Sequence, residues 1–298
     1  MKTQSSRHIA ALSFAALILS IPTHAPAQVV RSGAGPNATD ATLLAARDAF
    51  RLDIGGGTTA GANGSFGGVR REINWDGVPA AQAAPNNLAA NFFNSTSPRG
   101  AVFSTAGTGF MVSGATTDGG AGQPAAQNFG NINVAYTATF GQFTAPRLFT
   151  AIGSNVTDVT FFIPGTATTA TVTGFGSIFT DVDTAGTTTI QYFDQSNASL
   201  GTFTVPVATG SQGISFLGVS FTGGTKVGRV QITSGNAALG VAVIDVGATD
   251  LVVMDDFIYS EPTGVPEPST LGLCAVGLAG LLSARKRNRR GSSGKVQD

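Results

Sequence analysis

The chain has 298 residues, of which 42% are hydrophobic, 40 are glycine and only 11% are charged. This apolar share is enough for a folded core and argues against wholesale disorder. The formal net charge is zero, but nine basic and 15 acidic residues lie between positions 28 and 264, which gives that stretch a net charge of −6. An acidic stretch without a basic stripe argues against nucleic acid as a partner.

Residues 1–27 have the three parts of a secretory signal peptide. Lys2 and Arg7 form its positive region, residues 9–21 are an apolar run, and Ala-Pro-Ala at 25–27 provides small residues for cleavage. The alternative is an N-terminal membrane anchor, for which this run is short. We therefore expect the general secretion machinery to export the chain.

Residues 28–264 are predicted to form one exported body made mainly of β-strands. Residues 28–41 have the small, polar composition of a loose lead-in. A single short helix is expected at residues 41–50, with Asp40 as its N-cap. From residue 100 onward, runs rich in Val, Ile, Thr and Phe alternate with turn residues and predict strands. These runs are 101–105, 109–113, 132–140, 158–163, 170–180, 187–193, 200–205, 214–221, 227–233, 239–245 and 251–259.

Many short strands at this spacing predict a mainly β fold, an antiparallel, jelly-roll-like β-sandwich. Phenylalanines are expected to supply most of its core: Phe161, Phe162, Phe175, Phe179, Phe216, Phe221 and Phe257. The segments 174–183, 187–205, 214–221 and 252–262 resemble a jelly-roll domain found in many exported bacterial proteins. The last segment also resembles the closing strand of carbohydrate-binding sandwiches.

The chemistry available to the body is narrow. His8 and His24 lie in the predicted signal peptide and Cys274 lies near the C-terminus, so residues 28–264 contain neither His nor Cys. Catalysis by Ser-His-Asp or Cys-His groups is excluded there, as are zinc sites made of those ligands. We expect a non-catalytic body, although a carboxylate pair such as Glu72 and Asp76 would suffice for a glycosidase.

Trp75 and Asp76 are a candidate ligand site. In INWDGVP (73–79) they would place a carboxylate beside an indole that stacks on a sugar ring. The alternative, which we favour, is that Trp75 fills the core and Asp76 begins a turn.

Two pairs of aspartates are candidate ligands for a hard cation. Asp181 and Asp183 are spaced to share one side of a strand, and Asp255 and Asp256 are adjacent. Carboxylate oxygens suit Ca²⁺, so a structural Ca²⁺ is the one cofactor that the sequence indicates. Solvated turn aspartates are the alternative.

The C-terminus has three parts in a fixed order. A proline-stiffened spacer at 265–270 is followed by an apolar segment at 271–284, predicted to be a helix, and by a basic cluster at 285–290. A basic cluster after an apolar segment acts as a stop-transfer signal. Its charged members are Arg285, Lys286, Arg287, Arg289 and Arg290, and residues 291–298 form a short tail.

This end resembles the PEP-CTERM sorting signal of exported bacterial proteins, whose motif here is Val265-Pro266-Glu267-Pro268-Ser269. The resemblance implies that an exosortase, a membrane transpeptidase, recognises the motif and cuts near it. The chain would be anchored in the inner membrane before processing and would then reach the cell surface or the extracellular matrix. The alternative is a simple C-terminal membrane anchor.

Three functions are therefore compatible with the sequence. The leading hypothesis is an exosortase-sorted surface or matrix protein with a structural or adhesive body. The second is a carbohydrate-binding module for extracellular polysaccharide, and the third is a carboxylate-dependent glycosidase.

Overall fold

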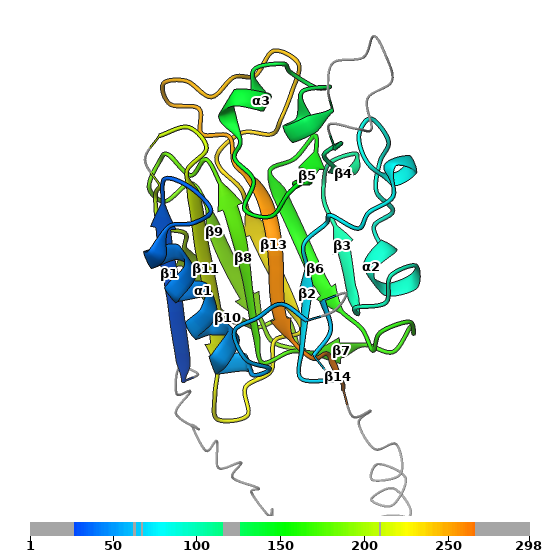
Figure 1. Cartoon of the computed structure of the whole chain (residues 1–298). Helices are drawn as coiled ribbons and strands as arrows, with labels where there is room; N and C mark the ends of the chain where they lie inside the picture. Colours follow the sequence, from blue (N-terminus) through cyan, green and yellow to red (C-terminus); the bar gives the residue numbers. More distant parts are fainter. Residues whose placement is uncertain (1–26, 62–63, 67, 116–125, 209, 266–298) are drawn as a thin grey trace, which may run out of the picture.

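The computed structural model describes residues 27–61, 64–66, 68–115, 126–208 and 210–265. These residues form two antiparallel sheets with few helices (Figure 1), which confirms the mainly β prediction. The predicted signal peptide up to residue 26, the sorting motif from Pro266 onward, the apolar segment and the basic cluster lie outside the described residues.

The larger sheet has seven strands. They are β1 (Gln28–Gly35), β2 (Arg70–Ile73), β4 (Gly109–Val112), β5 (Phe149–Ile152), β8 (Gly174–Thr180), β11 (Ile214–Phe221) and β13 (Val253–Ser260). Their order across the sheet is β1, β11, β8, β13, β5 and β4, and β2 also pairs with β13. All these pairs are antiparallel.

The smaller sheet has five strands in the order β10, β9, β12, β6 and β3. They are β3 (Ala101–Ser104), β6 (Val156–Phe161), β9 (Thr189–Phe193), β10 (Ser199–Thr204) and β12 (Arg229–Thr233). A further two-stranded pair, β7 (Ala170–Thr171) with β14 (Thr263–Gly264), ends the described fold.

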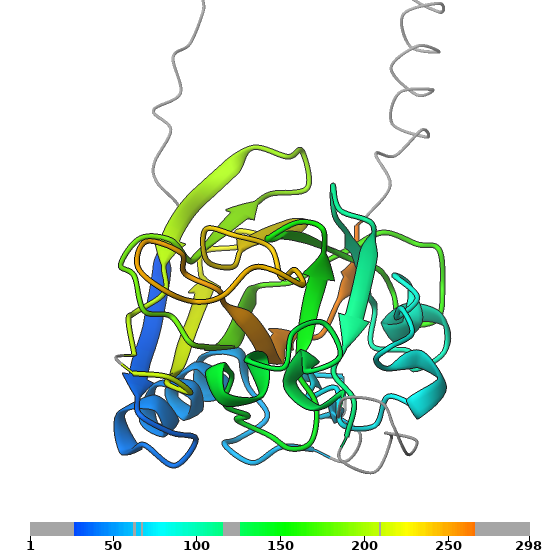
Figure 2. The same ribbon diagram turned by 90° about the horizontal axis from the view of Figure 1, so that it is seen from above.

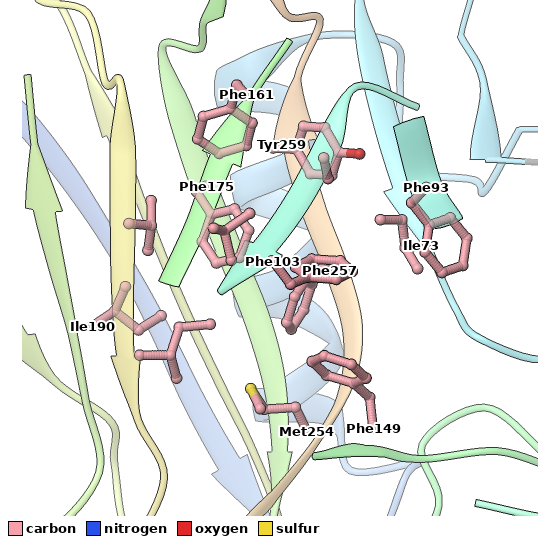
Figure 3. Close-up of a cluster of buried hydrophobic side chains, with 14 of the residues drawn as sticks. Ile73, Phe93, Phe103, Phe149, Phe161, Phe175, Ile190, Met254, Phe257 and Tyr259 are labelled. Atoms are coloured by element: carbon pink, nitrogen blue, oxygen red, sulfur yellow. The ribbon is translucent and has the colours of Figure 1, made fainter. Parts of the chain in front are cut away.

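Side chains of both sheets form one aromatic core (Figure 3). Phe103 and Phe161 of the smaller sheet lie in the same buried cluster as Phe149, Phe175 and Phe257 of the larger sheet. On the opposite face of the larger sheet, α1 (Ala41–Ile54) covers the part formed by β1, β8, β11 and β13 (Figure 2). The arrangement is consistent with the predicted β-sandwich, because two sheets share one core.

The predicted helix at residues 41–50 is confirmed as the first part of α1. The Asp40 side chain caps it by accepting hydrogen bonds from the backbone N–H groups of Thr42 and Leu43, at 2.8 and 3.1 Å. The helix continues to Ile54 and ends where Gly55 takes a φ of 93°, a conformation that costs glycine little.

The prediction of a loose lead-in at residues 28–41 is wrong, because this stretch contains β1. All eight residues of β1 pair with β11. The small side chains are needed because α1 packs on this strand: a Cβ on Gly33 would lie 2.6 Å from the carbonyl oxygen of Thr42. A composition typical of a loop is here the composition that allows a helix to approach closely.

Two predicted strands are also wrong. Residues 132–140 contain the short helix α3 (Tyr136–Thr139), and residues 239–245 form a loop. The Tyr136 hydroxyl holds this loop, because it accepts a hydrogen bond from the backbone N–H of Gly240 at 3.0 Å and donates one to the carbonyl oxygen of Val243 at 2.8 Å. Side-chain hydrogen bonds therefore join these two segments. The remaining short helices are α2 (Phe92–Ser95), η2 (Ala80–Gln82) and η3 (Gln127–Phe129).

The core predicts a large cost for Phe149→Ala. Phe149 is fully buried, and its ring stacks on Trp75 with 4.0 Å between centroids and 2° between planes. We expect the variant to lose about 3–5 kcal/mol of unfolding free energy in urea denaturation, because it leaves a cavity. Val30→Ala, at a side chain that is 44% exposed, is the control and should cost about 0.5 kcal/mol or less. A similar small loss in Phe149→Ala would contradict this account of the core.

Candidate functional site

The larger sheet is interrupted in the middle of β13, at Asp255 and Asp256. β13 pairs with β5 at Met254 and with β2 from Phe257 onward. Its register against β8 shifts over the same residues, so that two residues of β13 stand opposite one residue of β8. This is the pattern of a β-bulge, a device that redirects side chains.

The bulge keeps both carboxyl groups out of the aromatic core. In a regular strand, Met254 and Phe257 would face opposite sides, because they are three residues apart. Here both belong to the core shared by the two sheets. Asp255 and Asp256 instead reach the side chain of Thr144.

Asp255 and Asp256 are held by the segment at residues 143–144. The backbone N–H groups of Phe143 and Thr144 donate to Oδ2 of Asp255 at 2.7 and 3.2 Å. The Thr144 hydroxyl lies 3.2 Å from Oδ1 of Asp255 and 2.9 Å from Oδ1 of Asp256. This hydroxyl has one hydrogen, so both contacts are hydrogen bonds only when one carboxyl is protonated.

Burial favours that protonated form. Asp255 is fully buried and Asp256 is 4% exposed. Burial and the neighbouring Asp256 carboxyl raise the pKa of Asp255 well above its usual range. Burial also raises the pKa of Asp256 to about 6. Two adjacent carboxyl groups in a poorly solvated place do not both ionise readily.

Trp75 seals the interruption from the side of β2. Its indole N–H donates to the backbone carbonyl of Asp255 at 2.7 Å. The ring is 1% exposed and packs against Phe149 and Phe257. Trp75 therefore fills the core, which was the interpretation favoured from the sequence. Its ring face is not available for stacking on a sugar.

A cleft of about 760 Å³ lies beside this interruption, and Asp76 and Asp256 both line it. Asp76 is partly buried, and its Oδ1 accepts a hydrogen bond from the backbone N–H of Arg147 at 3.2 Å. Burial raises the pKa of Asp76. The structure thus brings the predicted ligand residue Asp76 to the same cleft as Asp256, which the sequence assigned to a metal.

Glu72 also reaches this cleft, but two arginines occupy its carboxylate. Arg51 donates to both oxygens, at 2.9 and 2.7 Å, and Arg70 donates to Oε1 at 2.8 Å. All three side chains are buried. Removing one member of such a network leaves an unpaired buried charge, so the geometry favours a structural role for Glu72 over an acid–base role.

Asp181 and Asp183 lie apart from this cleft, with Asp245. Carboxylate oxygens of these three residues lie within 4.8 Å of one another, and they form the one such group among the described residues. Burial and a hydrogen bond with Asp245 raise the pKa of Asp181 to about 9. Asp250 lies beside them, since its Oδ1 accepts from the backbone N–H of Asp183 at 3.0 Å.

The four aspartates predicted to bind a cation therefore lie in two separate groups. Asp181 and Asp183 are joined by Asp245, which lies in the loop at 239–245 that was predicted as a strand. Asp255 and Asp256 are joined by Thr144, more than a hundred residues earlier in the chain. No local pattern in the sequence marks either partner.

Comparison with known protein families finds a PEP-CTERM protein-sorting motif at residues 264–290. The chain carries a PEP-CTERM sorting signal. Such a signal implies an exported protein that an exosortase sorts and processes at its C-terminus. The match begins at Gly264, the last residue of β14. No curated protein and no solved structure matches the chain significantly.

The apolar and basic parts of the PEP-CTERM signal lie outside the described residues. Within the part of the chain that the structure describes, no helix has the length and apolar character needed to cross a membrane.

Calcium at Asp181 and Asp183 stays a prediction, and it has a direct test. If Ca²⁺ binds there, the melting temperature should be higher in Ca²⁺ than in excess chelator, because the ion binds only the folded state. Asp183→Asn should abolish this difference, and Asp158→Asn on β6 should keep it as the control. Equal melting temperatures of the unmodified chain in Ca²⁺ and chelator would contradict the prediction.

The buried carboxyl of Asp256 predicts a pH dependence of stability. Burial, with the nearby carboxylates of Glu72 and Asp76, raises its pKa from 3.8 to about 6. The folded chain therefore holds this proton more tightly, and the stability it provides is lost as the pH rises from about 4 to about 7. Asp256→Asn cannot ionise, so its melting temperature should fall less over this range than that of the unmodified chain. Asp53→Asn, an exposed partner of Arg31, is the control; an equal fall in Asp256→Asn would contradict the assignment.

Proposed function

We propose that this chain is a cell-surface or extracellular-matrix protein whose jelly-roll-like β-sandwich is a non-catalytic structural or adhesive module. The PEP-CTERM signal at residues 264–290 is the observation that carries the proposal. In this function the general secretion machinery exports the chain, the C-terminal segment anchors it in the inner membrane, and an exosortase then separates body from anchor.

The ends of the described fold support this sequence of events. β1 begins at Gln28, directly after the predicted cleavage position, so removal of residues 1–27 takes no residue from the sheet. At the other end, the N–H of Val265 donates to Thr169 at 3.2 Å, one residue before the Pro-Glu-Pro motif. The body therefore retains its sheets whole when both predicted segments are removed.

Both termini of the described chain lie at one end of the body, which leaves the other end free to contact a partner. β1 begins and β14 ends at the same end of the body (Figure 1), and α3 lies at the other end with the loop that follows β12. Val134, Val241, Ile244 and Val246 at that far end are 47–82% exposed. The side chain of Asn133 bonds to the carbonyl of Val241 at 3.3 Å, which brings the two segments together. Exposed apolar groups of this kind are common at contact surfaces.

A second candidate function, binding of extracellular polysaccharide, is favoured by the cleft at Asp76 and Asp256. The glycosidase alternative has less support, because Glu72 is held by Arg51 and Arg70.

The sorting proposal is tested by replacing Pro266, Glu267 and Pro268 with alanine in the full chain, in a host that contains an exosortase. We expect the unmodified chain to lose its C-terminal segment and leave the membrane fraction. The triple variant should stay in the membrane at its longer length, because the enzyme no longer recognises it. Pro206→Ala, a proline outside the motif, is the control and should be processed normally. Normal processing of the triple variant would contradict the proposal.

A further inference from the structure

The cleft beside the β13 bulge is lined by six parts of the chain. Arg47 and Arg51 come from α1, Arg71 and Glu72 from β2, and Asp76 follows β2. Residues 60, 61, 64 and 65 between α1 and β2, the segment around α2, the segment at 143–144 and the β13 bulge complete it. Its volume of about 760 Å³ lies in the range of small-molecule sites, about 300–1,000 Å³.

The four arginines of the cleft wall all hold partners. Arg51 binds the Glu72 carboxylate, and Arg71 binds both oxygens of Glu261 at 2.6 and 2.7 Å. Arg47 binds Asp48 at 2.7 Å, and Arg99 donates to the backbone carbonyl of Glu72 at 3.0 Å. Carboxylates thus pair with three of the four arginines, which reduces the positive charge that the wall presents to an anionic ligand.

The groups beside the bulge include both hydrogen-bond donors and hydrogen-bond acceptors. Asp76 and Asp256 line the cleft together with Thr144 and the exposed side chain of Asn74. Carboxyl, hydroxyl and amide groups together offer both hydrogen-bond donors and acceptors. Phe143, half-buried under the guanidinium of Arg47 at 5.3 Å, adds an apolar surface to the same cleft.

We propose that this cleft binds a neutral polyhydroxylated ligand, a saccharide unit of a polysaccharide, through Asp76 and Asp256 and against the ring of Phe143. Hydroxyl groups both donate and accept, as the lining requires. An anion would meet the two carboxyl groups, and an apolar ligand would leave unused the hydrogen-bonding capacity that these groups keep beside Arg147 and Thr144. The inference deepens the proposed adhesive role by naming the class of ligand that the body holds.

Gly77 provides a way to block the cleft without disturbing the core. It lines the cleft and is exposed, and a Cβ built on it meets nothing within 4 Å. Gly77→Trp would therefore place a large ring in the cleft, and Gly77→Ala is the matched control at the same position.

The test is affinity electrophoresis of the full-length chain in gels that contain dextran, galactomannan or xyloglucan, with alginate as an anionic polysaccharide. We expect at least one neutral polysaccharide to retard the chain and alginate not to retard it. Gly77→Trp, Asp76→Asn and Asp256→Asn should each lower the affinity about tenfold or more, whereas Gly77→Ala should not. Unchanged melting temperatures of the two Gly77 variants show that the fold is kept.

Two results would overturn the inference: no retardation by any of the neutral polysaccharides, or equal retardation of Gly77→Trp and Gly77→Ala. Either result leaves exosortase sorting standing, because sorting is measured on the tail. Hydrolysis of a polysaccharide that Asp256→Asn abolishes would support the saccharide site and overturn the non-catalytic assignment of the body.

Discussion

One buried interruption organises the larger sheet. Where β13 leaves β5 and joins β2, the carbonyl of Asp255 has no strand beside it, and a buried carbonyl without a partner is costly. The Trp75 indole donates to this carbonyl at 2.7 Å, and the backbone of residues 143–144 donates to the Asp255 carboxyl. Three segments that are distant in sequence are thus joined at one point. The same point lets the core aromatics remain on one side and the carboxyl groups on the other.

This joint explains why the cleft lies where it does. β2 and β5 diverge from β13 at the bulge, and the segments that follow β2 and precede β5 line the space between them. The neighbouring arginine network of Arg51, Arg70 and Glu72 then holds α1 to β2. The hydrogen bonds at this joint hold Asp76, Thr144 and Asp256 in place, so less ordering is needed for a ligand to bind.

The sequence predicted the parts of the fold that local patterns encode. The β13 run at 251–259, the helix at 41–50 and its cap at Asp40 depend on periodicity and neighbouring turn residues, and all three are present. β1 was missed because the small residues of its last half serve contact with α1, which no local pattern shows. The bulge was missed for a similar reason: MDDF resembles any strand end, and its partners at Thr144 and Trp75 lie far away in the sequence. The sorting signal was readable because its order of segments is linear.

The two sheets begin and end next to the two segments that we expect to be removed from the chain. Intact-mass spectrometry of the protein recovered from the surface or medium of an exosortase-bearing host tests this removal. We expect a chain that begins at Gln28 and ends within a few residues of Val265, where the last described sheet hydrogen bonds lie. A recovered chain that still extends to Asp298, with its apolar and basic segments intact, would contradict it.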